Sequence, residues 1–586
     1  MSYRAPLKDI SFVLNELLGH ERLAQLPDFE DYSAELAESV LSEAAKFAEG
    51  VLAPLNRAGD EEGSRWTPDG VKTPQGFKAA YRQYVEGGWP QLSADRQFGG
   101  QGMPQLLATA VQELWASANL AFKLCPMLTQ GAIEALQLSG SDEQKRRFLP
   151  KMVSGEWTGT MCLTEPQAGS DLGQIRTRAV PAGDHFRVFG QKIFITWGEH
   201  DYTENTIHMV LARIEGAPPG TKGISLFIVP KVNVNPDGSL GARNEVKCLK
   251  IEEKLGIHAS PTCVMQYGEA EGAAGYLVGE PNRGLEYMFV MMNAARLSVG
   301  LEGYAVSERA YQQALGWARD RVQGKPPVQS TSGKPLPITH HPDVKRMLLT
   351  MKSTTEAMRA LGLYAAMQLD LAHHSTDEAQ RAAAQARADF LIPIVKGWST
   401  ETGIEMASIG VQVHGGMGFV EETGAAQYLR DVRITTIYEG TTGIQSNDLI
   451  GRKIGRDRGA AIGALLTEGA QELKAIEAGP ALEALGLLRE STETLLRSLA
   501  TSPDRAFAVS VPFLELSGIV LGGWLMAKSG ALAAARLRQG GDREFLEGKV
   551  RTARFYADHV LPQAHALARV VKNGAASVVE TDAALL

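Results

Sequence analysis

The sequence predicts an α+β fold in which a strand-rich segment lies between two helical segments, and a further helical domain follows. Two observations carry this prediction. Apolar residues recur with helical spacing up to about residue 149, form short runs rich in Ile, Val, Phe and Thr between about 157 and 278, and then return to helical spacing. The length of 586 residues also exceeds what one hydrophobic core usually serves, so several domains are expected.

Five segments follow from these changes of pattern. We expect an N-terminal extension over residues 1–31, a helical domain over 32–156, a β domain over 157–279, a helical bundle over 280–454 and an extra helical domain over 455–586. The expected helices cover 34–51, 104–117, 131–138, 285–318, 344–371, 378–411, 459–478, 481–500, 505–537 and 543–572. The expected strands cover 185–196, 206–213, 223–229 and 262–266, with turns at 218–220 and 235–238 and a loop at 324–342.

The composition excludes several classes of protein. With 59 basic and 67 acidic residues, the formal charge of −8 gives no electrostatic attraction to nucleic acid or to an anionic membrane. The apolar stretch 511–526 is shorter than the roughly 20 residues that span a bilayer, so we interpret it as a buried helix and expect no integral membrane segment. The four cysteines show no spacing typical of a metal site, which predicts reduced thiols, no bound metal and a cytoplasmic protein.

The first segment with candidate chemistry covers residues 161–171. It begins as a strand and ends in an Ala-Gly-Ser-Asp turn, where small side chains and free backbone N–H groups let a planar or anionic group approach the main chain. An ordinary exit from a strand into a loop is the alternative interpretation.

The second segment covers residues 190–198. Alternate residues of a strand share a face, so Phe194 and Thr196 are expected to point the same way. An aromatic ring and a hydroxyl on one face suit a flat heteroaromatic ring, which the first packs against and the second hydrogen-bonds at its edge. A half-buried strand without a ligand is the alternative.

The third segment covers residues 437–445. Glu439 precedes a Gly-Thr-Thr-Gly turn, and a helical pattern starts directly after it with Thr441 and Thr442 as candidate N-caps. Glu439 is therefore either a reactive carboxylate or a helix-start acid that interacts with the helix dipole. The glycines at 415, 416 and 418 do not form a dinucleotide fingerprint, because they follow a helical pattern and not a strand.

In this order, around a strand-rich domain, the three segments resemble the acyl-CoA dehydrogenase family over about residues 32–454. The Asn-Ala-Ala-Arg-Leu run at 293–297, the Arg-Asp-Arg run at 319–321 and the segment 412–419 support the match. The resemblance implies the acyl-CoA dehydrogenase fold, with a β-barrel-like middle domain, and FAD as cofactor. It also implies α,β-desaturation of an acyl-CoA thioester to the trans-2-enoyl-CoA, with an electron-transferring flavoprotein as acceptor.

The resemblance also assigns site residues. It implies contact with FAD for Met161, Leu163, Thr164, Gly169, Ser170, Phe194, Thr196, Arg321, Gln412, Gly415, Gly416 and Thr441, and contact with the substrate for Ser170, Asn293, Arg296, Tyr438 and Gly440. Arg321 and the segment 412–416 match groups that reach FAD of a neighbouring subunit, which implies at least a dimer. Family members often carry Trp at the position of Phe194, and the aromatic face is kept here.

Glu439 matches the catalytic base of the family, which removes the α-proton of the substrate. Some relatives place the base on the helix of the Asn-Ala-Ala-Arg run, where this chain has Ala295, so the sequence favours Glu439. Burial against flavin and acyl chain is expected to raise the pKa of Glu439 toward the working pH. Arg296 is either a structural or a substrate-side arginine.

The segments 5–18 and 341–348 and the C-terminal block resemble the longer bacterial members, which include 3-methylmercaptopropionyl-CoA and fatty-acyl-CoA dehydrogenases. In these the extra domain covers a surface that shorter members use to form tetramers, so we expect a homodimer. Both a fatty-acyl chain and the methylmercaptopropionyl group remain open as substrates. The alternatives are an acyl-CoA oxidase that uses oxygen and a non-catalytic acyl-CoA-binding protein.

Overall fold

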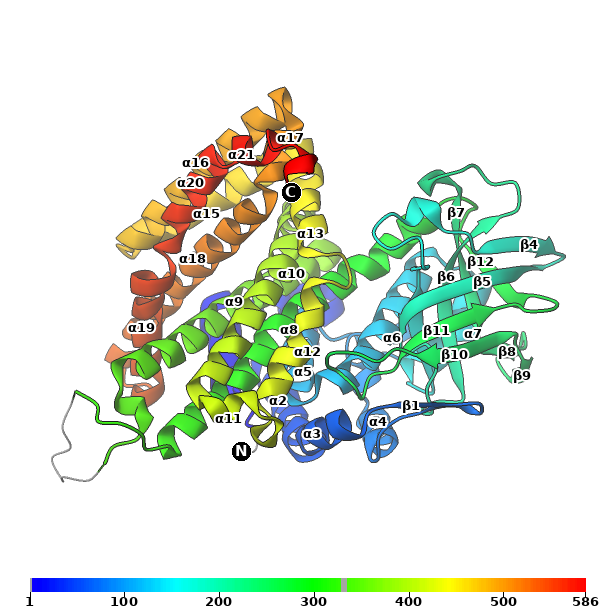
Figure 1. Cartoon of the computed structure of the whole chain (residues 1–586), viewed down its shortest axis with the longest axis horizontal. Coiled ribbons are helices and arrows are strands. Elements are labelled where there is room, and N and C mark those ends of the chain that lie inside the picture. The colour runs from blue at the N-terminus through cyan, green and yellow to red at the C-terminus, as the bar shows by residue number, and fades with distance from the viewer. Residues whose placement is uncertain (1–2, 328–334) are drawn as a thin grey trace. The chain divides into compact units, whose positions relative to one another are not determined.

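The computed structural model describes residues 3–327 and 335–586, and Figure 1 colours the chain from the N-terminus (blue) to the C-terminus (red). It divides into two compact units, which we describe separately. The strand unit comprises Phe47–Met103 and Ala118–Ala295, and the helical unit comprises Met1–Lys46, Pro104–Ser117 and Arg296–Leu586. Residues 328–334 of the loop predicted at 324–342 lie outside the described residues.

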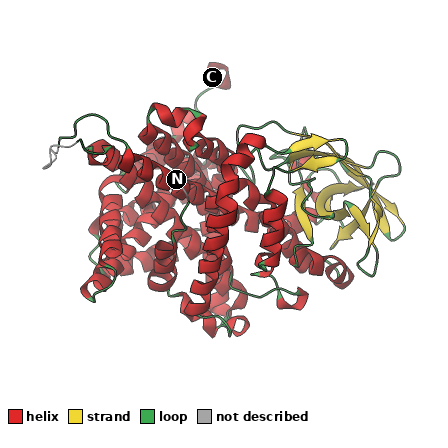
Figure 2. Cartoon of the chain, turned by 90° about the horizontal axis from the view of Figure 1, so that it is seen from below, coloured by secondary structure: helices red, strands yellow, loops and turns green. Residues whose placement is uncertain are grey.

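The strand unit is built on a sheet that closes on itself, and Figure 2 shows its strands gathered in one body. The strands are β3 (Trp157–Cys162), β4 (Arg178–Ala182), β5 (His185–Thr196), β6 (Asn205–Ile214), β7 (Ile224–Pro230), β10 (Val246–Ile251), β11 (Thr262–Tyr267) and β12 (Ala273–Val278). Their order is β10-β11-β5-β12-β7-β6-β3, and β4 pairs with both β5 and β6, which closes the ring β5-β12-β7-β6-β4. The predicted β-barrel-like domain is confirmed, and the four predicted strands agree with β5, β6, β7 and β11 to within one residue at each end.

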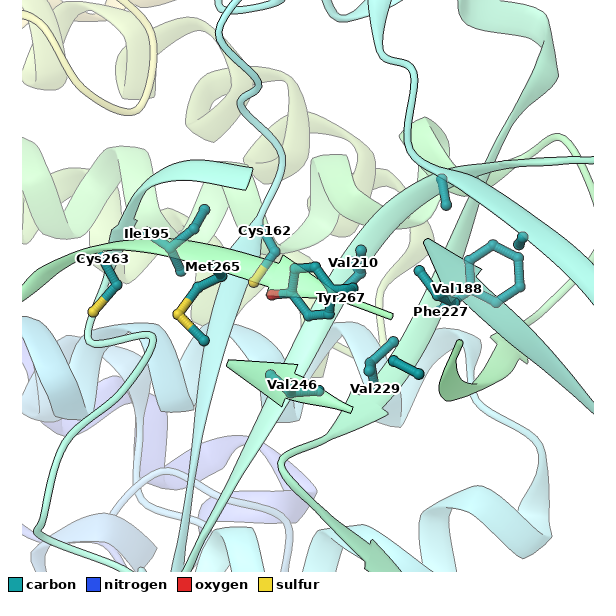
Figure 3. Close-up of a cluster of buried hydrophobic side chains, with 13 residues drawn as sticks. Cys162, Val188, Ile195, Val210, Phe227, Val229, Val246, Cys263, Met265 and Tyr267 are labelled. Carbon is teal, nitrogen blue, oxygen red and sulfur yellow. The ribbon is translucent and has the colours of Figure 1, made fainter. Parts of the chain in front are cut away.

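Apolar side chains from these strands form the core of the sheet. Figure 3 shows Val188, Val210, Phe227 and Tyr267 packed together, all fully buried. Burying one such side chain contributes about 1.5–3 kcal/mol. Cys162 and Cys263 belong to the same core, and all four cysteines of the chain are free thiols in the described structure, as predicted. Two short hairpins accompany the sheet, β1 (Arg65–Thr67) with β2 (Gly70–Lys72) and β8 (Val232–Val234) with β9 (Leu240–Arg243).

The strand unit also contains the helices α3 (Ala53–Glu62), α4 (Phe77–Glu86), α6 (Leu120–Ser139) and α7 (Asp142–Val153), and α8 (Gly284–Asp320) as far as Ala295. Helix α6 starts well before the predicted segment 131–138, because the Asn119 side chain caps it by accepting from the backbone N–H of Phe122 at 3.0 Å. It packs closely on β3: a Cβ added at Gly159 would lie 2.6 Å from the Ala132 Cβ, so this position requires glycine.

The helical unit contains most of the remaining helices. They are α1 (Leu7–Phe12), α2 (Ala34–Phe47), α5 (Gln105–Ala118), α8 (Gly284–Asp320, from Arg296 onward), α9 (Pro342–His374), α10 (Glu378–His414), α11 (Gly416–Phe419), α12 (Ala425–Val432), α13 (Thr442–Asp448), α14 (Gly455–Asp457), α15 (Ala460–Ala475), α16 (Gly479–Thr501), α17 (Pro503–Ala508), α18 (Ser510–Arg538), α19 (Arg543–Phe555), α20 (Gln563–Asn573) and α21 (Ala575–Val579). Two single helices predicted from the sequence are wrong: 505–537 is divided into α17 and α18, and 543–572 is interrupted by a π turn at Tyr556–Val560.

Helix α18 is the core helix of the C-terminal domain and packs against α9, α10, α16, α19 and α20. By length and composition it could cross a membrane, but 78% of its most apolar window is buried inside the protein. A Cβ at Gly518 would lie 2.2 Å from Trp398 of α10, so α18 and α10 approach closely there. The prediction of a buried helix at 511–526 is confirmed.

A buried group of charges joins the two ends of the chain, and we call it the Arg359 cluster. Arg359 pairs with Asp9 at 2.6 Å, with Glu113 at 2.6 Å and with Glu308 at 2.8 Å. Lys549 pairs with Asp9 at 2.6 Å and with Glu356 at 2.8 Å, and Lys352 also pairs with Glu356. The cluster connects α1 of the N-terminal extension with α19 of the extra C-terminal domain, and no local sequence pattern indicates it.

Candidate active site

Glu439 stands on a strained turn directly before α13. Its φ is +54°, a conformation that costs a non-glycine residue about 1–3 kcal/mol and that clusters at functional sites. Gly440 follows with φ +90°, and a Cβ there would lie 2.6 Å from the Gln445 side chain. The Thr441 hydroxyl accepts from the backbone N–H of Ile444 at 3.3 Å, so Thr441 is the N-cap, as predicted. Glu439 therefore lies two residues before the N-cap, outside α13, whose first turn holds no acidic residue.

Two buried side chains hold this turn. Lys396 of α10 donates from Nζ to the carbonyl oxygen of Gly440 at 2.6 Å. Gln445 donates from Nε2 to the carbonyl oxygens of Glu439 at 3.0 Å and Gly440 at 3.2 Å. Both side chains are fully buried, so these hydrogen bonds are shielded from water. Sequence reasoning missed both, although a lone lysine in the apolar run 391–398 was a visible signal for Lys396.

The environment of the Glu439 carboxyl makes it a weaker acid than usual. Burial raises the pKa of Glu439 to about 7, against the lowering effect of Lys396 and Arg296, while Glu302 adds to the increase. The residue stays half-buried, so its carboxyl remains open to approach. An increase in the pKa of Glu439 was expected from burial against flavin and acyl chain. The side chains of the protein already produce this increase without either ligand. A base with a pKa near the working pH is suited to proton transfer.

The neighbours of Glu439 are tied by further interactions. The Tyr438 hydroxyl donates to Glu302, which is fully buried on α8. Arg296, also buried, pairs with Asp448 at 2.9 Å. Of the two roles considered for Arg296, this ion pair favours the structural one.

In the strand unit, a buried ion pair fixes the turn at 161–171. Lys192 of β5 pairs with Glu165 at 2.8 Å and donates to the carbonyl oxygen of Leu163 at the same distance. Glu165 also accepts from the Thr177 hydroxyl at 2.6 Å. Although burial alone would raise the pKa of Glu165, Lys192 and these hydrogen bonds lower it to about 2. Sequence reasoning did not identify this pair, which holds Leu163 and Thr164 against β5.

Phe194 lies at a β-bulge of β5. The register with β11 shifts between Cys263 and Met265, so Phe194 takes a left-handed φ of +59° and its side chain is 60% exposed. Ile195 is buried and Thr196 is half-buried, so Phe194 and Thr196 both stay out of the core. The bulge shows that the strand is not regular at Phe194, and a shared direction of the Phe194 and Thr196 side chains stays a prediction. Bulges commonly re-aim a side chain beside an active site.

These residues of the strand unit fit a flat heteroaromatic cofactor. The Thr164 carbonyl accepts from the backbone N–H of Ile193 at 2.9 Å, which places Thr164 beside the β5 backbone directly before the exposed Phe194. Gly169 and Ser170 are exposed, and a Cβ at Gly169 would meet no atom within 4 Å. An exposed aromatic surface beside a turn of small residues is what a planar ring requires.

The other predicted residues lie on or directly after long helices, except Met161, which lies near the end of β3. Arg321 is exposed directly after α8 and donates to the Gln323 side chain at 3.0 Å. Gln412, Gly415 and Gly416 are exposed where α10 ends, after a helix and not after a strand, as predicted. Asn293 is half-buried on α8 in the strand unit, and Met161 is buried at the end of β3. Their contacts with FAD or substrate stay predictions.

Family models match almost the whole chain. Residues 35–156, 160–269 and 282–454 match the N-terminal, middle and C-terminal domains of acyl-CoA dehydrogenase. Residues 459–582 match the model described as acetyl-CoA dehydrogenase C-terminal like.

The curated relatives include full-length matches. The chain is 47% identical to the 3-methylmercaptopropionyl-CoA dehydrogenase of Ruegeria pomeroyi, over 97% of each chain. It is 36% identical to a broad-specificity linear acyl-CoA dehydrogenase of Mycobacterium tuberculosis, over 99% of each chain.

Solved structures share the fold. The Caenorhabditis elegans protein ACDH-11 in complex with C11-CoA superposes with a TM-score of 0.75 at 20% identity, covering 96% of this chain and 92% of that one. The Bacillus anthracis acyl-CoA dehydrogenase complexed with FAD gives 0.74 at 21% identity, covering 94% and 90%. The matched models and the full-length relatives together show that the chain belongs to the acyl-CoA dehydrogenase family.

Proposed function

We propose that the protein is an FAD-dependent acyl-CoA dehydrogenase in which Glu439 removes the α-proton of an acyl-CoA thioester. The observation that carries this proposal is the Glu439 carboxyl itself, which stands half-buried on a strained turn with a pKa of about 7. Because a half-protonated group near neutral pH both accepts and releases a proton readily, this carboxyl suits general base catalysis, which contributes typically about 10²–10⁴-fold in rate.

The residues around Glu439 prepare it for this step. Lys396 and Gln445 fix the carbonyl groups of the turn, so the carboxyl and the backbone N–H of Glu439 keep a constant geometry. A preorganised N–H can stabilise the negative charge that develops on the thioester oxygen as the α-proton leaves, and one such donor is worth about 2.7–4 kcal/mol. FAD, when bound, supplies the acceptor for the hydride that leaves the β-carbon. The product is then the trans-2-enoyl-CoA.

For the substrate we propose 3-methylmercaptopropionyl-CoA first and a straight-chain fatty acyl-CoA second. The support is the 47% identity, over nearly the whole chain, to a relative named for the first substrate, against 36% to one named for linear acyl-CoAs. A pocket separates acyl groups by about 1–3 kcal/mol per methylene, so a panel of thioesters should show a clear maximum.

The proposed electron acceptor is an electron-transferring flavoprotein, and the proposed assembly is a homodimer in the cytoplasm. The exposure of Arg321, Gln412, Gly415 and Gly416 supports a cofactor contact across subunits. Light scattering on the FAD-loaded protein measures the assembly. Peroxide formation at the rate of substrate turnover would favour the acyl-CoA oxidase instead.

The test of the proposed function is turnover by the FAD-loaded protein with a panel of acyl-CoAs, a dye acceptor and Glu439→Gln as the comparison. We expect turnover of at least one thioester by the native chain and retained FAD without turnover in the variant. A colourless protein that takes up no FAD would support the non-catalytic binding protein, and turnover by Glu439→Gln at the native rate would refute the role of Glu439.

A further inference from the structure

Lys396 is an unusual residue in the helical unit. Its side chain is fully buried on α10, yet it forms no ion pair in the described part of the chain, and its one hydrogen bond goes to the carbonyl oxygen of Gly440 at 2.6 Å. A buried ammonium without a carboxylate partner is costly, because desolvation of the charge is not repaid by a close opposite charge. Such a residue calls for an explanation beyond packing.

The surroundings of Lys396 provide one. Charged groups face it from three elements: Glu439 on the turn before α13, Glu302 and Arg296 on α8, and Glu401 on α10 itself. Burial lowers the pKa of Lys396 to about 8, and Glu439 is the largest of the influences that oppose the decrease. Lys396 in turn opposes the increase that burial causes in the pKa of Glu439. Arg296 opposes it as well, whereas Glu302 adds to it. Lys396 and Glu439 therefore influence each other's protonation without touching in an ion pair.

We propose that Lys396 is a positioning residue for Glu439, which holds the turn through the Gly440 carbonyl and supplies the positive charge that keeps the Glu439 carboxyl ionised near neutral pH. This inference rests on the proposed function of Glu439 as the base. A direct ion pair between Lys396 and the Glu439 carboxylate would block the carboxyl and make it too weak a base to remove the α-proton. Because Lys396 instead donates to the carbonyl oxygen of Gly440, its charge stabilises the Glu439 carboxylate from a distance. Both carboxyl oxygens then stay available to the substrate.

The first experiment compares the pH dependence of flavin reduction in FAD-loaded native protein, Lys396→Met and Lys396→Arg. Rapid mixing with an acyl-CoA gives the rate from the loss of flavin absorbance. In Lys396→Met the charge and the hydrogen bond are lost, so the midpoint of the acid limb should move up by about one pH unit. The rate near pH 6 should fall about tenfold more than the rate near pH 9. Lys396→Arg keeps the charge and should restore the midpoint.

Lys549→Met is the matched control, because Lys549 is equally buried but pairs with Asp9 and Glu356 in the Arg359 cluster. It should lower stability and leave the midpoint in place. An unchanged midpoint in Lys396→Met would overturn the proposal. So would a failure of both Lys396 variants to fold while Lys549→Met folds, because Lys396 would then be purely structural.

A second readout needs no turnover. Lys396→Met leaves the ionised Glu439 without its cation, so the melting temperature should drop more near about pH 7.5, where both groups are largely charged, than near about pH 5, where Glu439 is protonated. The Glu439→Gln background should remove that pH dependence, and an equal pH dependence in both backgrounds would contradict the coupling. If the native protein reduces no flavin with any acyl-CoA, the proposed function fails, whereas a native protein that works with an unmoved midpoint in Lys396→Met rejects only the role of Lys396.

Discussion

The helical unit holds two buried groups of charges that behave differently. In the Arg359 cluster, Arg359, Lys549 and Lys352 meet Asp9, Glu113, Glu308 and Glu356 in ion pairs at short distances. Around Glu439, in the described residues, neither the carboxyl nor Lys396 enters an ion pair. The first group therefore joins helices, while the second leaves a carboxyl open to react.

The carboxyls of Glu113 and Glu439 illustrate the difference between the two groups of charges. Burial raises the pKa of Glu113 to about 7 against the effect of Arg359, and burial raises the pKa of Glu439 to about 7 as well. Glu113 is fully buried and bonded to Arg359, whereas Glu439 is half-buried on a strained turn. A shifted pKa alone does not identify a catalytic acid; access to solvent or ligand decides.

The largest effect is expected from Glu439→Gln. Replacing the base with a neutral amide should slow flavin reduction by about 10²–10⁴-fold, because no other group stands on this turn to take the proton. The melting temperature should not fall, since an unpaired acid is removed. Glu113→Gln is the matched control and should keep the native rate. Equal losses of rate in the two variants would remove the distinction between the two carboxyls.

Arg359→Met should have the next largest effect, on stability. The substitution leaves Asp9, Glu113 and Glu308 buried without their common partner, and breaking a buried ion pair in this way costs about 3–5 kcal/mol. Denaturant unfolding measures the loss. A variant as stable as the native chain would show that the cluster does not hold the helices together.

Asp9→Asn should cost less, because Arg359 keeps two carboxylates and Lys549 keeps Glu356. We expect a loss of about 1.5–3 kcal/mol, the value of hydrogen bonds to charged groups, and faster proteolysis near the N-terminus. Lys8→Met is the control, since Lys8 forms an exposed pair with Asp542 and should change neither quantity. Similar proteolysis of the two variants would argue against Asp9 as the anchor.

Glu113→Gln should have the smallest effect, and its sign depends on pH. The folded pKa of Glu113, about 7, lies above the ordinary value of 4.5, so its contribution to stability is complete below about pH 4.5 and is lost as the pH rises through 7. Near pH 8 the amide should therefore raise the melting temperature, and near pH 5 the two chains should melt alike. A lower melting temperature for the variant near pH 8 would show that the Glu113 charge stabilises the fold.

Much of the fold was predictable because hydrophobic period reports secondary structure directly. Strand β5 and helices α9 and α10 were predicted from it, because apolar residues recur at a constant spacing along each of these long segments. The start of α6 was not found, because it depends on a side-chain cap at Asn119 and not on period. The division near Val509 and the π turn at Tyr556 were also missed, since the Ala- and Leu-rich composition continues through both.

Residues of the candidate site could be predicted only where they belong to a local sequence motif. Glu439, Thr441 and the Phe194 strand were found from local pattern. Lys396, Gln445 and Glu302 were not, because they act across sequence separations that no local pattern reports. The Arg359 cluster joins residues from Asp9 to Lys549 and depends entirely on the tertiary fold.

The pH dependence of flavin reduction in the FAD-loaded native protein tests the role of Glu439 most directly. If Glu439 is the base, the rate should rise with pH through a single midpoint near its pKa of about 7 and then level off, and Glu113→Gln should show the same curve. A rate that stays constant from about pH 5 to about pH 9, or a midpoint that moves in Glu113→Gln, would contradict the assignment.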